Sequence, residues 1–495
     1  MSPSLSSRLG PSPHLHLLQE GSFSHEAALL LQQQIPDLVL EFHQRIIDAW
    51  SRLGQGHAVL LPVENAGSGP VKQHLELLRQ ADDRRVAGEV RLCVDMRAGG
   101  KAGTDLRSVT HVHSHRQALL QCNQFLQNRD RLPALEECVA EDSTAQALQR
   151  VTNLSHIALG TRSAIEMHGL VDLQGESVAN LPPQQNVTQF LVVVPNGETH
   201  AVQPERRYHA LFLRPEKDVP GVLATILGII KSMRVNLQSF HSLRSNGGRR
   251  AFYMETDGST STPGEVRCMA QSLANSAAVA SLDWVGSWDD IAFSPEYQSA
   301  AASDGEGPPA VLGQDRLDCS LRYHSFRFRT HDKPGVLCDV LQPLSPMGVN
   351  LLELDSVTRG EKQYDFMATV DAGKGERGRF EAIAGLLHHH PALQEIEWMH
   401  SRSVPPVLGR YSVSDPWFVG QVTSRFMEHL VRADESLPPG LVSALQLPES
   451  GQNAIGMKDA LLADPDLYRR QEILAEMVLA SSEASEPQLA AEIPA

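Results

Sequence analysis

The stretch Asn186-Val187-Thr188-Gln189-Phe190 follows a turn rich in proline and glutamine and opens an apolar run over residues 190–194. Consecutive apolar and β-branched residues are typical of a strand that is covered on both faces. The two amides and the hydroxyl at the start of this strand would then lie at the edge where α/β sheets bind their ligands. Taken alone, Thr188 is more typical of a strand-entry or capping residue than of a catalytic one.

The composition limits the classes of function that the chain can have. Its 495 residues predict three or four domains, and 43 basic against 59 acidic residues give a formal charge of -16. This charge argues against broad binding to nucleic acid or to anionic membranes. The six cysteines form no CxxC pair and have no metal-ligand spacing, so we expect reduced thiols and no metal. Without a membrane-length apolar run or a signal peptide, the sequence predicts a cytoplasmic protein.

Two units of strand followed by helix precede the Thr188 stretch. The first places Ser22 at a predicted helix start after a strand at 14–18, where unpaired backbone N–H groups favour an anion. The second ends in Glu64-Asn65-Ala66-Gly67-Ser68-Gly69, where glycines permit close approach of a ligand. Glu64 is therefore a candidate acid or base. Further strands and helices alternate up to residue 162, which predicts an α/β architecture of two lobes.

Six successive segments carry a resemblance to prephenate dehydratases over residues 14 to 195. They are residues 21–24, 62–69, 114–115, 143–147, 158–160 with 168–170, and 186–190. The resemblance implies a two-lobed, periplasmic-binding-protein-like α/β domain that acts on prephenate without a cofactor, and it implies that Thr188 is the catalytic threonine. We expect Glu64 to assist as a proton source and the substrate to be held by Ser22, Asn65, Ser68, Ser114, Ser143, Thr144, Asn186 and Gln189.

The chain departs from this family next to its most characteristic residue. Gln189 stands where the family has an arginine, so a fixed cation and its fork of donors are missing there. Two alternatives to a dehydratase remain open, the first favoured by Gln189 and the second by the duplicated module and the C-terminal segment described below. One is a prephenate decarboxylase of specialised metabolism that does not aromatise its product, and the other is a catalytically silent protein that senses small molecules.

An internal repeat follows the first domain. Pro-Gly-Val-Leu, Val-Asn-Leu and an aspartate recur with a constant shift of 114 residues, from 220 to 334, from 236 to 350 and from 257 to 371. Both copies resemble the ACT domain, a ferredoxin-like α+β module that often binds an amino acid at a paired interface. The resemblance implies an amino-acid effector bound by Gly221, Val222, Leu223, Asn236, Gly335, Val336, Leu337 and Asn350, and a homo-oligomer formed through the modules.

These observations predict five segments along the chain. They are a dehydratase-like domain at 14–197, ACT-like modules at 207–290 and 320–400, a helical appendix at 401–480 and a disordered tail at 481–495.

Overall fold

The protein is represented by a computed structural model that describes Leu5, Leu9 and residues 13–402, with gaps at 68, 82, 142, 196–200, 245–249, 290, 296–308, 359–362 and 374–376. The chain divides into two units, 1–403 and 404–495, and the description covers the first. Residues 401–402 end a strand, and the rest of the predicted appendix and tail lie outside the described residues. Within the described part, no helix is long and apolar enough to cross a membrane.

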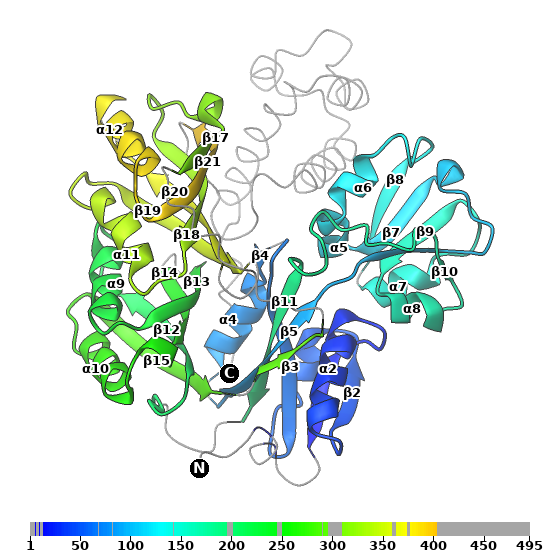
Figure 1. The fold of residues 1–495 in the computed structure, drawn as a ribbon. Helices are drawn as coiled ribbons and strands as arrows, with labels where there is room; N and C mark the ends of the chain where they lie inside the picture. Colours follow the sequence, from blue (N-terminus) through cyan, green and yellow to red (C-terminus); the bar gives the residue numbers. More distant parts are fainter. Residues whose placement is uncertain are drawn as a thin grey trace, which may run out of the picture. The chain divides into compact units, whose positions relative to one another are not determined.

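The first lobe is one end of a long sheet, with neighbouring strands in the order β5-β11-β3-β1-β2 (Figure 1). Strand β1 runs parallel to β2 and β3, whereas β11 is antiparallel to both β3 and β5. Both faces of β11 are buried, as its sequence predicts. The elements are β1 (His14–Leu18), α2 (Phe23–Gln34), β2 (Val39–His43), α3 (Ile46–Trp50), β3 (His57–Asn65), β4 (Gly69–Pro70), α4 (Lys72–Gln80), β5 (Arg85–Cys93) and β11 (Val187–Val194).

The second lobe is a separate five-stranded sheet in the order β10-β6-β9-β7-β8. Strand β7 lies between β8 and β9 and runs parallel to both, and so repeats the arrangement around β1 in the first lobe. The elements are β6 (Arg97–Gly100), β7 (His111–His115), α5 (Arg116–Gln121), α6 (Asn123–Gln127), β8 (Glu137–Glu141), α7 (Thr144–Gln149), β9 (His156–Gly160), α8 (Arg162–Met167) and β10 (Val171–Asp172).

The two copies of the repeat fold as two modules with the same β-α-β-β-α-β order. Module 1 has the strand order β13-β14-β12-β15, and module 2 has the equivalent order β19-β20-β18-β21. Module 1 comprises β12 (Tyr208–Pro215), α9 (Val222–Ser232), β13 (Asn236–Arg244), β14 (Arg250–Asp257), α10 (Pro263–Ala274) and β15 (Val279–Trp288). Module 2 comprises β18 (Tyr323–His331), α11 (Val336–Leu341), β19 (Asn350–Thr358), β20 (Gln363–Asp371), α12 (Arg377–His388) and β21 (Leu393–Arg402). Short strands β16 (Ile291–Phe293) and β17 (Ala310–Leu312) pair with β5 and β21.

The modules share one hydrophobic core. Helices α9 to α12 lie on one face of the joined module sheet, where their apolar side chains pack together (Figure 1). Aromatic residues on the other face of module 1 pack against the first lobe: Tyr208, Phe212, Tyr253 and Trp288 lie in one cluster with Leu61, Leu75 and Leu191. Apolar burial of this kind stabilises by roughly 25 cal/mol per Å². Apolar burial therefore contributes to the free energy that holds module 1 against the first lobe.

A pseudo-two-fold seam joins β13 to β19 at the antiparallel pair His241 and Asp355. On one side, Ser242 Oγ donates to Leu354 O (3.0 Å) and accepts from Leu354 N (2.9 Å). On the other side, Phe240 N donates to Ser356 Oγ (2.7 Å). Residues 354, 355 and 356 are the repeat counterparts of 240, 241 and 242, so the seam joins equivalent positions of the two modules.

The helices beside the seam meet through two glycines in equivalent places. Gly221 and Gly335 begin α9 and α11 with φ angles of 87° and 83°, a left-handed conformation that favours glycine. A Cβ on Gly221 would collide with Ser345, and one on Gly335 would collide with Lys231. Ser345 is the repeat counterpart of Lys231. The Pro-Gly-Val-Leu motif is therefore a packing requirement of the paired modules.

We expect Ser242→Ala and Ser356→Ala to lower the free energy of unfolding by similar amounts, about 1 kcal/mol each, because each removes seam hydrogen bonds of the same kind. Thermal denaturation of both variants beside Ser232→Ala, an exposed serine at the end of α9, measures this. A loss in one variant without a loss in the other would contradict the equivalence of the two sides.

Candidate functional site

Thr188 lies in a cluster of amides at the edge of the first lobe. Asn65 Nδ2 donates to Thr188 Oγ1 (2.9 Å) and to Asn186 Oδ1 (2.9 Å), and Gly67 N donates to Asn65 Oδ1 (2.8 Å). Asn65 and Asn186 are buried, whereas Thr188 is partly exposed. Because the amide occupies an acceptor site of the Thr188 oxygen, the hydroxyl proton is directed to donate elsewhere. The cluster can thus present a donor to a bound ligand.

Antiparallel pairing explains why these residues meet. Thr188 is the second residue of β11 and pairs with Asn65, the last residue of the neighbouring strand β3. The beginning of β11 therefore lies at the carboxyl ends of β1 and β3, which is where α/β sheets bind ligands. Thr188 thus lies at the edge of the sheet that the sequence indicates, although β11 itself is antiparallel to its neighbours.

The edges of the two lobes at which their parallel strands end contact each other beside this site. Ser22 caps α2 by accepting from His25 N (3.4 Å), and the preceding Gly21 accepts through its carbonyl from Thr161 Oγ1 of the second lobe (3.2 Å). Ser143, which caps α7, donates to Gln19 Oε1. Ser22 and Ser143 therefore belong to facing edges, as a site between two lobes requires.

The other residues predicted to bind the substrate have varied environments. Thr144 is buried at the start of α7, next to Ser143. Ser114 is also buried, and its hydroxyl donates to Leu159 O (2.8 Å), so it joins neighbouring strands instead of facing a ligand. Ser68 lies outside the described residues.

Glu64 and Gln189 do not lie with Thr188, contrary to the sequence prediction that all three act on one substrate. Successive side chains of a strand point to opposite faces. Asn65 and Thr188 face the amide cluster, whereas their neighbours Glu64 and Gln189 contact module 1. Strand alternation alone could have separated these residues, because 64 and 65, like 188 and 189, are adjacent in extended segments.

Gln189 lies between two buried carboxyl groups. Its Nε2 donates to Glu89 Oε1 (3.0 Å) and to Glu255 Oε2 (2.7 Å), while Tyr253 Oη donates to Glu255 Oε1 (2.5 Å). Arg91 Nε also donates to Glu89 Oε1 (2.6 Å). Burial, followed by the negative charge of Glu89, raises the pKa of Glu255 to about 7. Because the amide of Gln189 carries no positive charge, it does not offset the negative charge of Glu89, and Glu255 is the carboxyl that keeps its proton.

Two residues of the edge were missed by the sequence analysis. Gln121 Oε1 accepts from Asn186 Nδ2 (3.3 Å), and Thr161 caps α8 while it bonds to Gly21. A threonine between a strand and a helix is a recognisable capping signal, so Thr161 could have been found. Gln121 lies within helix α5 and has no such local signal.

The histidines of the second lobe make hydrogen bonds to neighbouring side chains. His113 lies 3.2 Å from Glu141 Oε1 through Nδ1 and 3.1 Å from His156 Nδ1 through Nε2. Over the part of the chain that the structure covers, no group of three or more His, Cys, Asp and Glu side chains is arranged to hold a metal ion.

We expect Glu255→Gln to change how stability depends on pH. A carboxyl whose pKa is raised on folding binds its proton more tightly in the folded state, so stability falls as pH rises from the unfolded value through about 7. The variant should lose this fall between pH 5 and about 7, as measured by melting temperature across pH. Glu166→Gln, at an exposed carboxyl, should keep the slope of the unmodified protein. An unchanged slope of melting temperature against pH in Glu255→Gln would contradict the raised pKa of Glu255.

Comparisons with known proteins agree with the sequence resemblance. Residues 16–198 match the family model "Prephenate dehydratase". The chain is 27% identical over 262 residues to a bifunctional chorismate mutase/prephenate dehydratase of Enterobacter agglomerans, covering 50% of this chain and 65% of that protein. It is 24% identical over 247 residues to the prephenate dehydratase of Methanocaldococcus jannaschii, covering 49% and 86%.

A solved structure of prephenate dehydratase from Arthrobacter aurescens in complex with L-Phe is 22% identical, with a TM-score of 0.48, covering 59% of this chain and 93% of that one. The match with the Enterobacter protein spans just under two thirds of that protein's length. The family model covers both lobes, from β1 to β11, including Asn65 and Thr188. Residues 16–198 of this chain are a domain of the prephenate dehydratase family.

Proposed function

We propose that the protein is a prephenate dehydratase, which converts prephenate to phenylpyruvate. The observation that carries the proposal is the hydrogen bond from Asn65 Nδ2 to Thr188 Oγ1 (2.9 Å) within the family domain. It joins two motif residues 123 positions apart and orients a hydroxyl at the edge where the two lobes meet. This is the group that the resemblance assigns to catalysis.

The reaction requires a proton donor at the departing hydroxyl. The bond between the ring and its carboxylate breaks to release carbon dioxide, and its electron pair enters the ring as the carbon–oxygen bond at the 4-position breaks. The leaving oxygen accepts a proton and departs as water, and the product is aromatic. Thr188 is the proposed hydrogen-bond donor to that oxygen, because its own oxygen already accepts from Asn65, and any proton that it passes to the leaving oxygen is replaced from water. Glu64 is not the proton source, since it faces module 1.

Substrate carboxylates need hydrogen-bond donors at the same edge. The start of the twelve-residue helix α2 supplies unpaired backbone N–H groups and a favourable helix dipole next to Ser22. Ser143 and Thr144 extend this edge from the second lobe. The cation missing at position 189 does not bear on this binding, since Gln189 lies on the other face. Its absence therefore gives no support to the alternative of a non-aromatising decarboxylase.

The test is incubation of the purified protein with prephenate, followed by ultraviolet absorbance and the proton signals of the ring. We expect phenylpyruvate, and we expect Thr188→Ala to lower kcat about 100-fold with little change in KM, because it removes a transition-state interaction. Thr152→Ala, at an exposed threonine, is the matched control.

The other outcomes of this assay separate the remaining alternatives. A non-aromatic keto acid would identify a decarboxylase, and unchanged prephenate would identify a silent binding protein. A normal kcat in Thr188→Ala would remove Thr188 from the mechanism.

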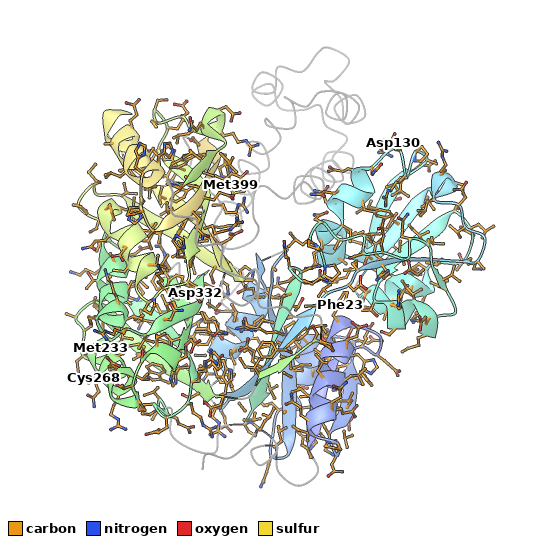
Figure 2. The ribbon with its side chains drawn as sticks, in the orientation of Figure 1. Phe23, Asp130, Met233, Cys268, Asp332 and Met399 are labelled. Carbon is orange, nitrogen blue, oxygen red and sulfur yellow. The ribbon has the colours of Figure 1, made fainter. Side chains whose placement is uncertain are left out.

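We propose that the two modules are ACT-type domains that bind one amino-acid effector per chain. A pocket lies between the β18–α11 turn of module 2 and the beginning of β13 in module 1, and Asp332 marks it in Figure 2. Its lining includes Asn236, Gly335, Val336 and Leu337, four of the residues that the sequence predicts for the effector. Asn236 Nδ2 donates to Asp332 Oδ1 across the module boundary (2.6 Å). The pocket therefore offers polar groups beside apolar walls.

The equivalent position on the other side of the seam contains an arginine. Asp218 and Leu351 are the repeat counterparts of Asp332 and Leu237. Arg250 forms an ion pair with Asp218 (3.0 Å) and donates to Leu351 O. Gly221, Val222, Leu223 and Asn350 belong to this second position, where the Arg250 guanidinium already occupies the Asp218 carboxylate that a ligand ammonium group would need.

Pairing within one chain changes the expectation for oligomers. The predicted homo-oligomer relied on the surfaces by which ACT-type modules pair. Here β13 and β19 pair with each other, and α9 packs against α11. Those surfaces are therefore already used inside the chain.

We also propose a cytoplasmic location, supported by six cysteines that are all free thiols.

We expect L-phenylalanine to bind with a stoichiometry of one per chain by isothermal titration calorimetry. Asn236→Ala should weaken binding about tenfold, because it removes a polar group of the pocket, whereas its counterpart Asn350→Ala should leave affinity unchanged. Two equal sites, or equal losses in both variants, would contradict the one-pocket proposal. If tyrosine or tryptophan binds instead, the same comparison applies to that ligand.

A further inference from the structure

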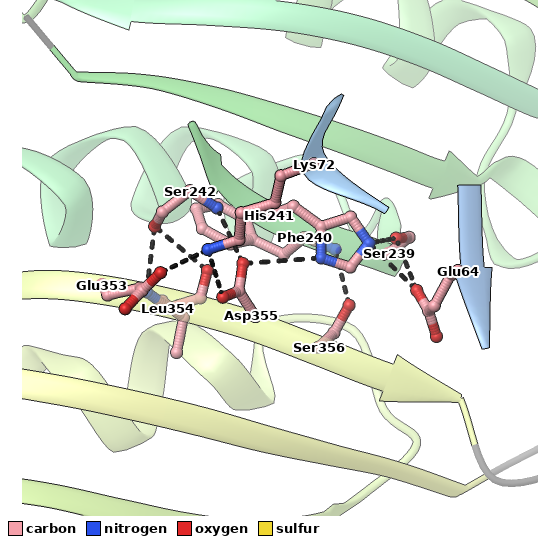
Figure 3. A network of polar contacts seen from close by, with 10 residues as sticks. All are labelled: Glu64, Lys72, Ser239, Phe240, His241, Ser242, Glu353, Leu354, Asp355 and Ser356. Atoms are coloured by element: carbon pink, nitrogen blue, oxygen red, sulfur yellow. Dashed lines mark hydrogen bonds and ion pairs between the residues drawn. The ribbon is translucent and has the colours of Figure 1, made fainter. Parts of the chain in front are cut away.

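A buried polar network connects the dehydratase domain to both modules (Figure 3). It begins at Glu64 on β3, passes through His241 on β13 to Asp355 on β19, and ends at Lys72, the first residue of α4. His241 is 1% exposed and Glu64 is 2% exposed, so neither side chain has access to water. Buried charges of this kind persist only when they are paired.

His241 lies between two carboxylates that come from different parts of the protein. Its Nε2 donates to Glu64 Oε2 (3.0 Å), and its Nδ1 is 3.7 Å from Asp355 Oδ1. Its ring is parallel to that of Tyr253, with centroids 6.2 Å apart. Burial opposes the charged form, but the two carboxylates outweigh burial and raise the pKa of His241 to about 9. The imidazolium is therefore a fixed cation near neutral pH.

Lys72 makes a second connection to module 2. Its Nζ pairs with Asp355 Oδ2 (2.7 Å) and with Glu353. Burial opposes the charge on Lys72, but Asp355 and then Glu353 raise its pKa above the usual range. Asp355 thus contacts both His241 and Lys72, and the two cations are held by one carboxylate at the centre of the seam.

These contacts hold both ends of the short stretch from Glu64 to Lys72, of which residue 68 is not described, and we call this stretch segment 64–72. Within it, Asn65 donates to Thr188, and Gly67 N donates to the Asn65 side chain. Ala66 N donates to Val187 O (2.8 Å), and Val71 N donates to Val63 O (2.7 Å). The segment that orients Thr188 is therefore attached to module 1 at Glu64 and to module 2 at Lys72.

We propose that His241 is a positioning residue for the Thr188 site: with Lys72, it holds segment 64–72 so that Asn65 keeps the Thr188 hydroxyl oriented. The effect passes along a single strand, because Glu64 and Asn65 are neighbours that face opposite sides of β3. The contacts of His241 with Glu64 and of Asp355 with Lys72 consequently set the geometry of the site. The kinetic part of this inference rests on the proposed function, and the structural part does not.

The test is amide hydrogen exchange in His241→Phe, which keeps a ring beside Tyr253 but removes both nitrogens. The reporters are the amides of Ala66, Gly67 and Val71, whose acceptors lie in or beside the segment. We expect these amides, and those of residues 187–189, to exchange at least tenfold faster. Ser242→Ala is the matched control, because it breaks seam hydrogen bonds without contacting Glu64 or Lys72. It should accelerate exchange in β13 and β19 alone.

The kinetic readout is kcat with prephenate. We expect His241→Phe to lower kcat at least tenfold with little change in KM. His241→Gln should recover part of this loss, and Ser242→Ala should keep a normal kcat. Unchanged exchange at residues 64–72, or equal acceleration in the control, overturns the inference. If His241→Phe does not fold, Lys72→Met applies the same criteria from the other end of the segment. If the unmodified protein does not convert prephenate, the proposed function fails while the exchange experiment still decides the positioning role.

Discussion

The buried pairing of Glu64 with His241 is the interaction on which the rest of the structure depends. It joins the strand that leads into the candidate active site to the strand at the centre of the module pair. Removing one member of such a pair leaves an uncompensated buried charge and typically costs about 3–5 kcal/mol. Leu61, Leu75, Tyr208 and Trp288 belong to an apolar cluster that joins the same two parts of the protein. Because the two charges are buried between these parts, each needs the other as its partner. Hydrophobic packing brings the parts together, and the charges fix their register.

The internal repeat gives this chain a pair of joined modules without a second subunit. The backbone of the seam is nearly symmetric, since the serines at 242 and 356 bond equivalent residues. The side chains break that symmetry. Histidine and aspartate occupy the equivalent positions 241 and 355, so two residues that would repel as identical charges form an attractive contact. Tandem duplication allows this difference, whereas identical subunits would place the same residue on both sides.

The same asymmetry distinguishes the pocket beside Asn236 from the equivalent position across the seam. Asn236 and Asp332 face each other at one, while Arg250 binds Asp218 at the other. A single chain can therefore have a pocket at one of two equivalent positions and an ion pair at the other. The proposed link through Lys72 and His241 connects this asymmetric unit to a site that belongs to a different domain.

The sequence by itself determined the family, the two-lobed α/β organisation of the first domain and the duplication that follows. Local signals were sufficient for these features: a buried strand pattern at 190–194, helix caps at Ser22 and Ser143, and the constant shift between the repeats. The resemblance also grouped Thr188 with Asn65 and Asn186, which lie together because β3 ends where β11 begins. The two modules were expected from the repeated motif, and each folds with the same order of elements.

Only the tertiary structure decided which face each functional side chain occupies and which surfaces pair. The resemblance grouped Glu64 and Gln189 with Thr188, but the alternation of side chains along each strand turns them toward module 1. The partners His241 and Glu255 lie 177 and 66 residues away, a distance over which no local pattern specifies contact. Pairing of β13 with β19 inside one chain, in place of pairing between subunits, likewise depends on how two edges meet in space. Contacts of this kind are set by the packing of the whole domain, which no single segment of sequence encodes.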